Sequence, residues 1–253
     1  MTLPLLLSLP HAGTGVPRRL AGNCLLSEAQ IVHDGDEFAA EIYAPLESAV
    51  RYMVRTDVAR AVLDMNRAED DLRKDGVVKT HSCWDEPIWK RPLDAKHTQW
   101  LIETYHRPYH RRLSELARDR GLLLAIDCHT MAEYGPPIGP DPASKRPQAC
   151  LGNVNGNSCP DEWTTILQRA LQRHFPGEVT VNRPFSGGYI TRFHGAEMPW
   201  IQLELSRGAF ASPGEKSGWV AASIEDAVAQ ITARLDRVGG KPPIYPGPKK
   251  AEP

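Results

Sequence analysis

The sequence lacks a long apolar run. Its longest apolar stretch, Leu3 to Leu9, is interrupted by Pro4 and has no basic flank. A membrane-spanning helix needs roughly 20 apolar residues, and a signal peptide carries positive charge before its apolar core. We therefore expect neither a membrane span nor a signal peptide.

An excess of charge of either sign is also lacking. The 253 residues include 30 Lys and Arg and 31 Asp and Glu, which gives a formal net charge of -1. Proteins that bind nucleic acid or anionic membranes present a basic surface. The composition therefore predicts small-molecule partners, no nucleic acid and no membrane, and leaves the oligomeric state open.

Cysteine is scarce, and its five residues are irregularly spaced with no C-x-x-C pair. This pattern indicates neither a disulfide framework nor a structural zinc knuckle, and it is typical of a reducing cytoplasm. Cys128 precedes His129, but neighbours on a strand point to opposite faces. If His129 faces a site, Cys128 faces the core, which disfavours a thiol nucleophile.

Short apolar runs alternate with amphipathic stretches, the pattern of an α/β layered domain. We predict one domain over residues 1–238, followed by a Pro/Gly/Lys-rich tail over 239–253. The predicted strands are Pro4–Leu9, Arg51–Thr56, Ala61–Asp64, Leu122–Asp127, Ala149–Leu151, Val179–Asn182 and Trp200–Leu205.

Three longer stretches predict amphipathic helices: Asp94–Arg118, Asp161–Phe175 and Ser217–Val238. Pro108 is expected to kink or break the first of them. The segments Thr80–Leu93 and Ala132–Gln148 are rich in proline or glycine, and we interpret them as loops that could cover a site.

Ionisable residues stand where predicted strands end. His11 follows the first apolar run in LSLPHAG, His129 follows another in AIDCHT, and Glu204 closes a third in IQLELS. In an open α/β sheet, ligands gather outside the carboxyl ends of the strands. Two histidines and a carboxylate in one crevice favour a metal-dependent hydrolase over three unrelated core residues.

An acidic third ligand would complete such a site, because catalytic zinc takes three protein ligands and keeps an open position. The segment HDGDE offers Asp34 and Asp36, of which we prefer Asp36. Either residue could instead cap a helix. The sequence lacks the further spacing and closing Glu of a calcium loop, so that interpretation is rejected.

Two further motifs suit an anionic substrate. Asn66-Arg67 follows an apolar run, and a guanidinium matches a carboxylate with two parallel hydrogen bonds. A surface ion pair with the acids at 69–71 is an equal alternative. Tyr189 and Arg192 follow a Gly-Gly turn and could face a ligand, although a plain turn would leave the same pattern. HRPYH, with His106 and His110, is not an H-E-x-x-H site, so these histidines are interpreted as structural.

The motifs resemble, in order, those of the N-formylglutamate amidohydrolase family: SLPHAG, DGD, LDMNR, YHRPYH, DCHT, GGYITRFHG and LELS. That family is similar to the zinc carboxypeptidase and aspartoacylase fold, a single α/β domain whose mixed, mostly parallel sheet is flanked by helices. One departure is that Thr14 stands where the carboxypeptidases place a Glu three residues after the first His. The acidic ligand must then come from elsewhere, and the resemblance favours Asp36.

The resemblance implies hydrolysis of an N-acyl amino acid, above all N-formyl-L-glutamate in histidine degradation. It implies one zinc per chain and Glu204 as general base. Other small acidic amides, cleaved by a metallocarboxypeptidase or deacylase, form the alternative, and a non-catalytic binding protein of the same fold is a second. The residues that the resemblance assigns are, for zinc, His11, Asp36 and His129, and for the substrate, Asn66, Arg67, Tyr189 and Arg192.

Overall fold

The computed structural model describes residues 2–237 and 239 and contains one six-stranded sheet. The strand order is β2-β1-β3-β6-β4-β5, and all neighbouring strands pair in parallel except β4 and β6. This confirms the predicted α/β class with a mixed, mostly parallel sheet. The strands are β1 (Leu3–Leu9), β2 (Val50–Arg55), β3 (Leu124–Met131), β4 (Ala149–Gly152), β5 (Val179–Val181) and β6 (Trp200–Ser206).

The two faces of the sheet are covered by different helices. Along β1, Leu5, Leu7 and Leu9 join one buried cluster, whereas Leu6 joins the other. The alternation follows from the pleat, which points successive side chains to opposite faces. A run buried on both faces is therefore almost wholly apolar, as in LPLLLSL.

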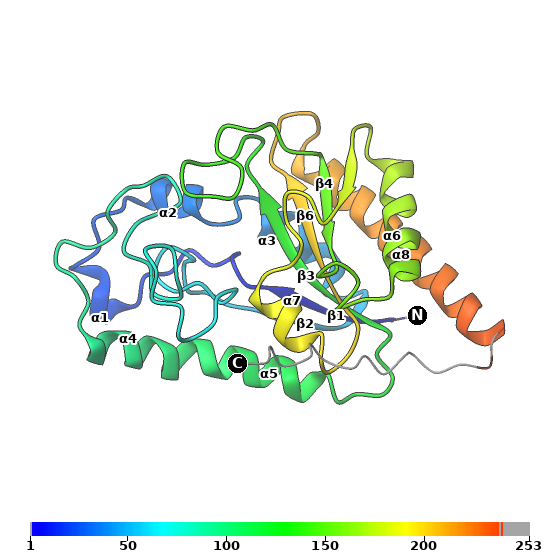
Figure 1. Cartoon of the computed structure of the whole chain (residues 1–253), viewed down its shortest axis with the longest axis horizontal. Coiled ribbons are helices and arrows are strands. Elements are labelled where there is room, and N and C mark those ends of the chain that lie inside the picture. Colours follow the sequence, from blue (N-terminus) through cyan, green and yellow to red (C-terminus); the bar gives the residue numbers. More distant parts are fainter. Residues whose placement is uncertain (1, 238, 240–253) are drawn as a thin grey trace.

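On one face lie α3 (Ala39–Tyr43), α6 (Asp161–His174) and α8 (Pro213–Arg237), and α6 packs along α8. On the other lie α5 (Arg107–Leu116) and α7 (Tyr189–His194), which contact β2 and β6 respectively. Figure 1 shows α6 and α8 together at one side of the sheet and α5 along another. The remaining helices are α1 (Arg18–Ala21), α2 (Glu28–Asp34), a 3-10 turn over Ala44–Leu46 and α4 (Ala95–Leu101).

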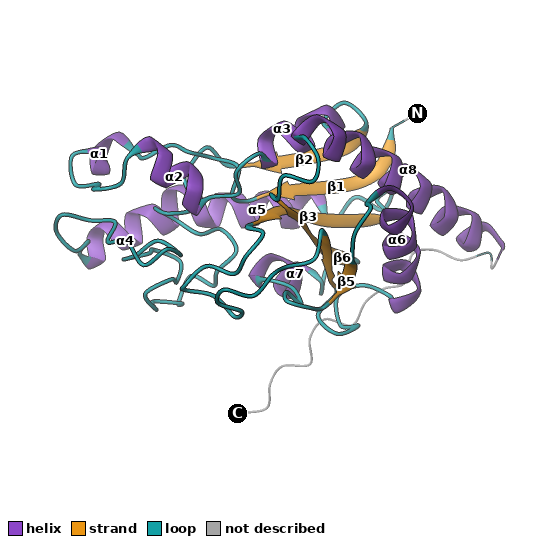
Figure 2. Ribbon diagram, turned by 90° about the horizontal axis from the view of Figure 1, so that it is seen from above, coloured by secondary structure: helices purple, strands orange, loops and turns teal. Residues whose placement is uncertain are grey.

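Long loops gather at one end of the sheet, away from the N-terminus (Figure 2). They follow the carboxyl ends of β1 and β3, which run parallel to each other and to β6. The connections after these strands therefore share one edge, which is where an open α/β sheet places its ligand.

The predicted strand Ala61–Asp64 is wrong. This segment is a buried turn in which the Leu63 amide donates to Ala59 O and the Asp64 amide donates to Val77 O. Its apolar side chains pack in the cluster under α4 and α5, so burial, and not pairing in the sheet, accounts for the run. Four apolar residues cannot by themselves distinguish a strand from another buried segment.

Pro108 neither breaks nor ends the helix predicted around it. A π-helical turn over Ile102–His106 joins α4 to α5, and the Arg107 amide donates to Ile102 O, five residues earlier. Pro108 follows closely on this π turn, so the residue without an N–H stands where the hydrogen-bond pattern already departs from that of an α-helix. The helix therefore continues from Ala95 to Leu116.

The predicted tail, apart from Gly239, lies outside the described residues, and the domain limits at 1–238 stay a prediction. Among the described residues, no helix is long and apolar enough to cross a membrane.

Candidate active site

Two strands place a histidine and a carboxylate side by side. His129 in β3 is the register partner of Glu204 in β6. The structure extends β3 through Met131, so His129 lies within the strand and not after it as predicted. Cys128 points to the opposite face and is buried in the core, as alternation requires.

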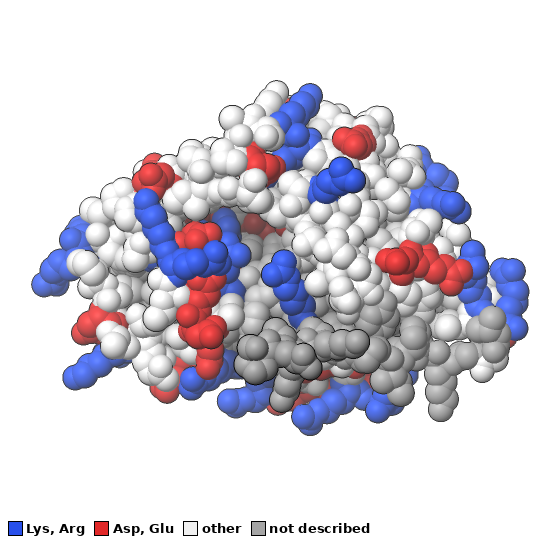
Figure 3. Space-filling view, viewed as in Figure 1, with Lys and Arg blue, Asp and Glu red and all other residues white. Residues whose placement is uncertain are grey.

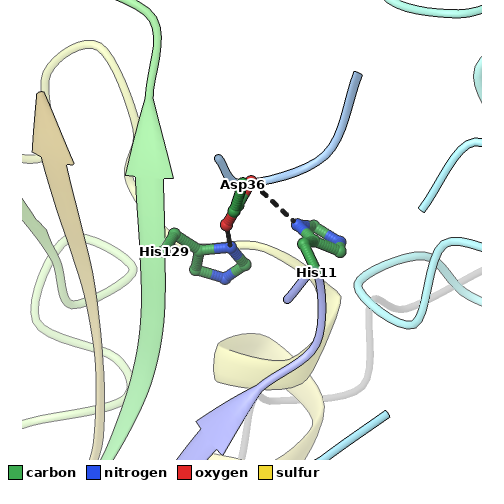
Figure 4. A group of neighbouring side chains, drawn as sticks. All are labelled: His11, Asp36 and His129. Atoms are coloured by element: carbon green, nitrogen blue, oxygen red, sulfur yellow. Dashed lines mark hydrogen bonds and ion pairs between the residues drawn. The ribbon is translucent and has the colours of Figure 1, made fainter. Parts of the chain in front are cut away.

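Asp36 connects His129 to His11. Its Oδ2 lies 2.9 Å from His129 Nδ1, and its Oδ1 lies 3.5 Å from His11 Nδ1. Figure 4 shows the carboxylate between the two rings. The chain holds it there because the Thr130 amide donates to its Oδ2 and its own amide donates to His11 O. One ligand atom from each of the three residues lies within 4.8 Å of the others, and all three residues are buried.

Asp34, the alternative acidic ligand, forms a buried ion pair away from the two histidines. It is fully buried and its carboxylate lies 3.1 Å from the ammonium of Lys79, which is also fully buried. The Cys83 amide donates to it as well, at 2.6 Å. The structure therefore brings Asp36, and not Asp34, to the two histidines.

A second carboxylate stands behind each histidine. His11 Nε2 lies 2.7 Å from Asp64 Oδ1, and His129 Nε2 lies 2.9 Å from Asp127 Oδ2. Histidines that ligate metals donate their second ring N–H to a carboxylate in this way, which fixes the tautomer and turns the other nitrogen toward the ion. Both Nδ1 atoms are thereby free to face Asp36.

Sequence reasoning missed Asp64 and Asp127. Asp127 stands two residues before His129, and since side chains two apart share a face of a strand, the D-x-H spacing was a usable signal. Asp64 left only a general signal, an acid closing an apolar run. Its partner lies 53 residues away.

The charges of this cluster reinforce one another. Burial opposes the charge of His11, but Asp64 and Asp36 outweigh it and raise the His11 pKa. For His129 burial is likewise outweighed, mainly by Asp127 and Glu204, and the pKa is raised well above its ordinary value. Burial would raise the Asp36 pKa, yet His11 and His129 hold it below the usual range. The site therefore favours a cation among its carboxylates.

Glu204 differs from these acids because none of the described histidines or arginines forms a close ion pair with it. Gln202 Nε2 donates to its Oε1 at 2.7 Å, and only 7% of the residue is exposed. Burial is the main reason that the Glu204 pKa is raised. A carboxylate held in this way accepts a proton more readily than an exposed one.

Asn66 connects Asp127 to α7 by side-chain hydrogen bonds. Its Nδ2 donates to Asp127 Oδ2 at 3.3 Å, and its Oδ1 accepts from the Ile190 amide at 2.8 Å. Gly188 packs against this amide so closely that an added Cβ would lie 2.2 Å from Asn66 Nδ2, and only glycine fits there. The turn at 64–67 is thereby joined to α7.

The residues predicted to bind the substrate differ in whether they line the cavity. Arg67 and Arg192 both line the cavity, and Arg67 donates to Asp75 through Nε and Nη2. Tyr189 does not line it, but lies against the rings of His106 and His110.

His106 and His110 form hydrogen bonds with the main chain. His106 Nε2 lies 2.8 Å from Arg67 O, and His110 Nε2 lies 2.9 Å from Met65 O. The π turn before α5 therefore presents two histidines to the turn that carries Asn66. This agrees with their interpretation as structural residues.

The site opens into a cavity of about 630 Å³, within the range of small-molecule sites, about 300–1,000 Å³. Both predicted covering loops contribute to its lining, the first through Cys83 and the second through Pro136, residues 138–140 and Arg146. The Ile138 amide donates to Cys83 O and joins the two loops. Figure 3 shows this face hollowed near its middle, with acidic and basic side chains beside the hollow.

Comparison with known proteins shows the family to which the chain belongs. The family model for N-formylglutamate amidohydrolase matches residues 3–211. An N-formylglutamate deformylase of Pseudomonas putida is 28% identical over 227 residues, covering 84% of each chain. A deformylase of the same name from Pseudomonas aeruginosa is 28% identical over 221 residues, covering 81% of each.

Two solved structures have the same fold. A crystal structure of N-formylglutamate amidohydrolase from Ralstonia eutropha gives a TM-score of 0.74 at 20% identity, covering 94% of this chain and 95% of that one. A gene product from Agrobacterium tumefaciens gives 0.72 at 17% identity and 90% coverage of both. The family model spans all of the residues gathered at the site, and the chain belongs to the N-formylglutamate amidohydrolase family.

Proposed function

We propose that the protein hydrolyses the amide bond of an N-acyl amino acid in a zinc-dependent reaction, and that its substrate is N-formyl-L-glutamate. The products would be formate and L-glutamate. The observation that carries the proposal is the buried group of His11, Asp36 and His129 beside Glu204 at the cavity. Family membership and the two deformylase relatives support the choice of substrate.

The donor set fits one zinc ion per chain. Two imidazole nitrogens and one carboxylate are typical ligands of catalytic zinc, which leaves a position for water or substrate. Each ring already has its second nitrogen against a carboxylate, Asp64 or Asp127, as a ligating histidine requires. When bound, the ion supplies Lewis acidity toward the acyl oxygen and lowers the pKa of water.

Glu204 is the proposed general base. It lies next to His129 across the β3–β6 register, and its raised pKa suits a group that must take a proton and then release it. Gln202 keeps Oε1 in place by its hydrogen bond. The carboxylate would accept the proton of the attacking water and pass it to the leaving amine.

Arg67 and Arg192 are proposed to bind a carboxylate of the substrate and so orient the scissile bond, where orientation alone supplies several kcal/mol. Asn66 is proposed to act mainly by holding Asp127 and α7, since its side-chain amide already has partners. The proposal assigns no substrate contact to Tyr189, which lies outside the cavity lining.

We also place the protein in the cytoplasm. All five cysteines are free, and four of them are buried. A reducing compartment keeps such thiols unpaired.

Metal content and formate release test the proposal together. The purified protein is expected to contain about one zinc per chain, to release formate from N-formyl-L-glutamate, to lose this activity on chelation and to regain it with zinc. Bound zinc without formate release moves the substrate to another acyl amino acid. A panel with N-formimino-L-glutamate, N-acetyl-L-aspartate and a C-terminal dipeptide then identifies it.

Two substitutions test the assigned roles. Glu204→Gln is expected to keep zinc and to lower kcat by about 10²- to 10⁴-fold, as loss of a general base does. Unchanged turnover would remove Glu204 from the mechanism. Asp36→Ala is expected to lose zinc, whereas Asp34→Ala is expected to lower stability because it leaves Lys79 buried and unpaired.

A further inference from the structure

Six arginines line the cavity, and most of their charges are already compensated. Four have a carboxylate oxygen within 3.3 Å of a guanidinium nitrogen. These ion pairs are Arg60–Asp64, Arg67–Asp75, Arg73–Asp71 and Arg146–Asp141. Two arginines remain, Arg192 and Arg207, and they differ from the other four because no described carboxylate lies that close to them.

Arg207 is nearly buried, with 11% of its side chain exposed. Its Nη1 donates to Gly35 O at 3.1 Å and approaches His33 O at 3.4 Å, and the nearest carboxylate, Glu37, is 3.9 Å away. Within the described part of the chain, its Nε and Nη2 have no hydrogen-bond partner. A mostly enclosed guanidinium with spare donors beside a cavity can bind an anion.

Arg192 has even more unused donors. It is exposed on α7, and its guanidinium makes no hydrogen bond or ion pair with any described residue. Asn66 binds the first turn of α7 through the Ile190 amide, so Arg192 and Arg67 extend from the same wall. Arg207 belongs to another wall, because its amide donates to Met131 O at the ends of β3 and β6.

We propose that Arg192 and Arg207 are two separate carboxylate anchors, each of which binds one carboxylate of a dicarboxylic N-acyl amino acid. The inference rests on the proposed function for the amide that is cleaved, and it adds the residues that recognise each of the two carboxylates. Arg67, on the wall of Arg192, supports the same carboxylate as Arg192. Arg207 receives the other one and excludes substrates that lack it.

Three substrates share the scissile bond and differ only in charge: N-formyl-L-glutamate, N-formyl-L-glutamine and the α-amide N-formyl-L-isoglutamine. We expect Arg207→Met to lower kcat/KM for the diacid by about 10- to 100-fold, the usual range for a lost charge-assisted hydrogen bond. For one of the two monoamides the same variant is expected to change kcat/KM by less than about 3-fold. Arg192→Met is expected to show the complementary pattern, with little effect on the other monoamide.

A structural role would give a different result. Arg207 also contacts Gly35 O beside Asp36, so its loss could disturb the metal ligands. That disturbance would lower kcat/KM for all three substrates by one factor, and the ratio between substrates would not change. Zinc content is measured in each variant, and Arg207→Lys, which keeps the charge but not the planar fork, is expected to restore part of the ratio.

Arg73→Met is the matched control. Arg73 lines the same cavity, but it is paired with Asp71 and 69% of its side chain is exposed. The substitution removes the same charge as Arg207→Met and is expected to leave the ratios of kcat/KM between the substrates unchanged. A change in ratio equal to that of Arg207→Met would mean that overall charge, and not a specific anchor, selects the substrate.

Calorimetry separates this inference from the proposed function. Binding of L-glutamate, L-glutamine and L-isoglutamine needs no turnover, so the anchors can be tested even if the protein releases no formate. We expect the unsubstituted protein to bind L-glutamate most tightly. Each anchor variant is expected to bind L-glutamate and one of the two monoamides with the same affinity, because it has lost the arginine that recognises the missing carboxylate. L-glutamate that binds no more tightly than its monoamides, or two variants that respond to the same carboxylate, would overturn the proposal.

Discussion

Two pairs of buried histidines in this protein differ in the direction in which their pKa values are shifted. His11 and His129 have raised pKa values, because the nearby carboxylates outweigh the effect of burial. Burial lowers the pKa of His106, and burial with the neighbouring His106 and His194 lowers that of His110 to about 2. The first pair therefore favours a positive charge, and the second pair excludes one.

The difference lies in the partners of each ring. The second nitrogen of His11 and of His129 faces a carboxylate, whereas His106 and His110 donate to main-chain carbonyls. A carboxylate stabilises a cation on the ring or bound to it strongly enough to offset burial, whereas the hydrogen bond to a neutral carbonyl does not offset it. A buried histidine thus becomes a candidate metal ligand through its partner and not through its burial.

The largest expected effect comes from removing one histidine of each pair. His129→Ala is expected to lose zinc and to lower kcat/KM by about 10³-fold or more, since metal assistance contributes several kcal/mol. His110→Ala is expected to keep its zinc and to unfold more easily. Elemental analysis and formate assays on both variants check this, and zinc loss in His110→Ala alone would reverse the two roles.

The carboxylate partners provide the next test. Asp127→Asn keeps the shape of the side chain but removes its charge, and we expect zinc affinity to fall about 10- to 100-fold. Asp75→Asn is the control, because Asp75 lines the cavity but pairs with Arg67 and not with a histidine. Competition with a chelator measures both affinities, and equal losses in the two variants would contradict a specific role for Asp127.

The raised pKa values predict how the stability of the metal-free protein depends on pH. Below pH 6.5, the ordinary histidine pKa, the folded and unfolded chains both hold the protons on His11 and His129, so this stabilisation is complete. As pH rises through the higher folded pKa values, the stabilisation is lost. Relative to His129→Asn, the metal-free protein should therefore lose stability in urea unfolding as pH rises above 6.5.

Zinc reverses this trend, because protons compete with the metal for the same nitrogens. The zinc-loaded protein is expected to gain stability over the same interval. A metal-free protein that gains stability relative to the variant would show that the carboxylates do not govern these histidines.

His110 predicts a smaller effect of opposite sign. Its folded pKa lies near 2, below the ordinary 6.5, so between these values the unfolded chain binds a proton that the folded chain excludes. Stability should fall as pH decreases from 6.5, by about 1 kcal/mol per pH unit. His110→Gln, which can still donate to Met65 O, should reduce that slope. An unchanged slope in urea unfolding between pH 6.5 and 4.5 would contradict the assignment.

The sequence was most informative where function follows strand order. His11, His129 and Glu204 each close or follow an apolar run, and parallel pairing of β1, β3 and β6 brings such positions to one edge. The spacing of LPLLLSL and of the amphipathic helices likewise predicted most elements. These features depend on local periodicity, which neighbouring residues determine.

It was least informative where partners are distant along the chain. The segment at 61–64 resembles a strand because it is apolar, but its burial under α4 and α5 depends on tertiary packing. Tyr189 follows a Gly-Gly turn that suggested a ligand contact, yet the π turn before α5 brings two histidine rings against it. Arg207 gave no local signal and Asp64 gave only a general one, since Asp64 meets His11 53 residues away and Arg207 donates to carbonyls 174 and 172 residues away.

By itself, the sequence determined the α/β class, the neutral charge balance and the positions of the chemically active side chains along the strands, because these depend on composition and short-range periodicity. Only the tertiary structure decided that Asp36 and not Asp34 meets the histidines, that Asp64 and Asp127 stand behind them, and which arginines keep unused donors. Each of those outcomes is a competition among buried charges for partners. Such a competition is settled by distances in space, which no local pattern records.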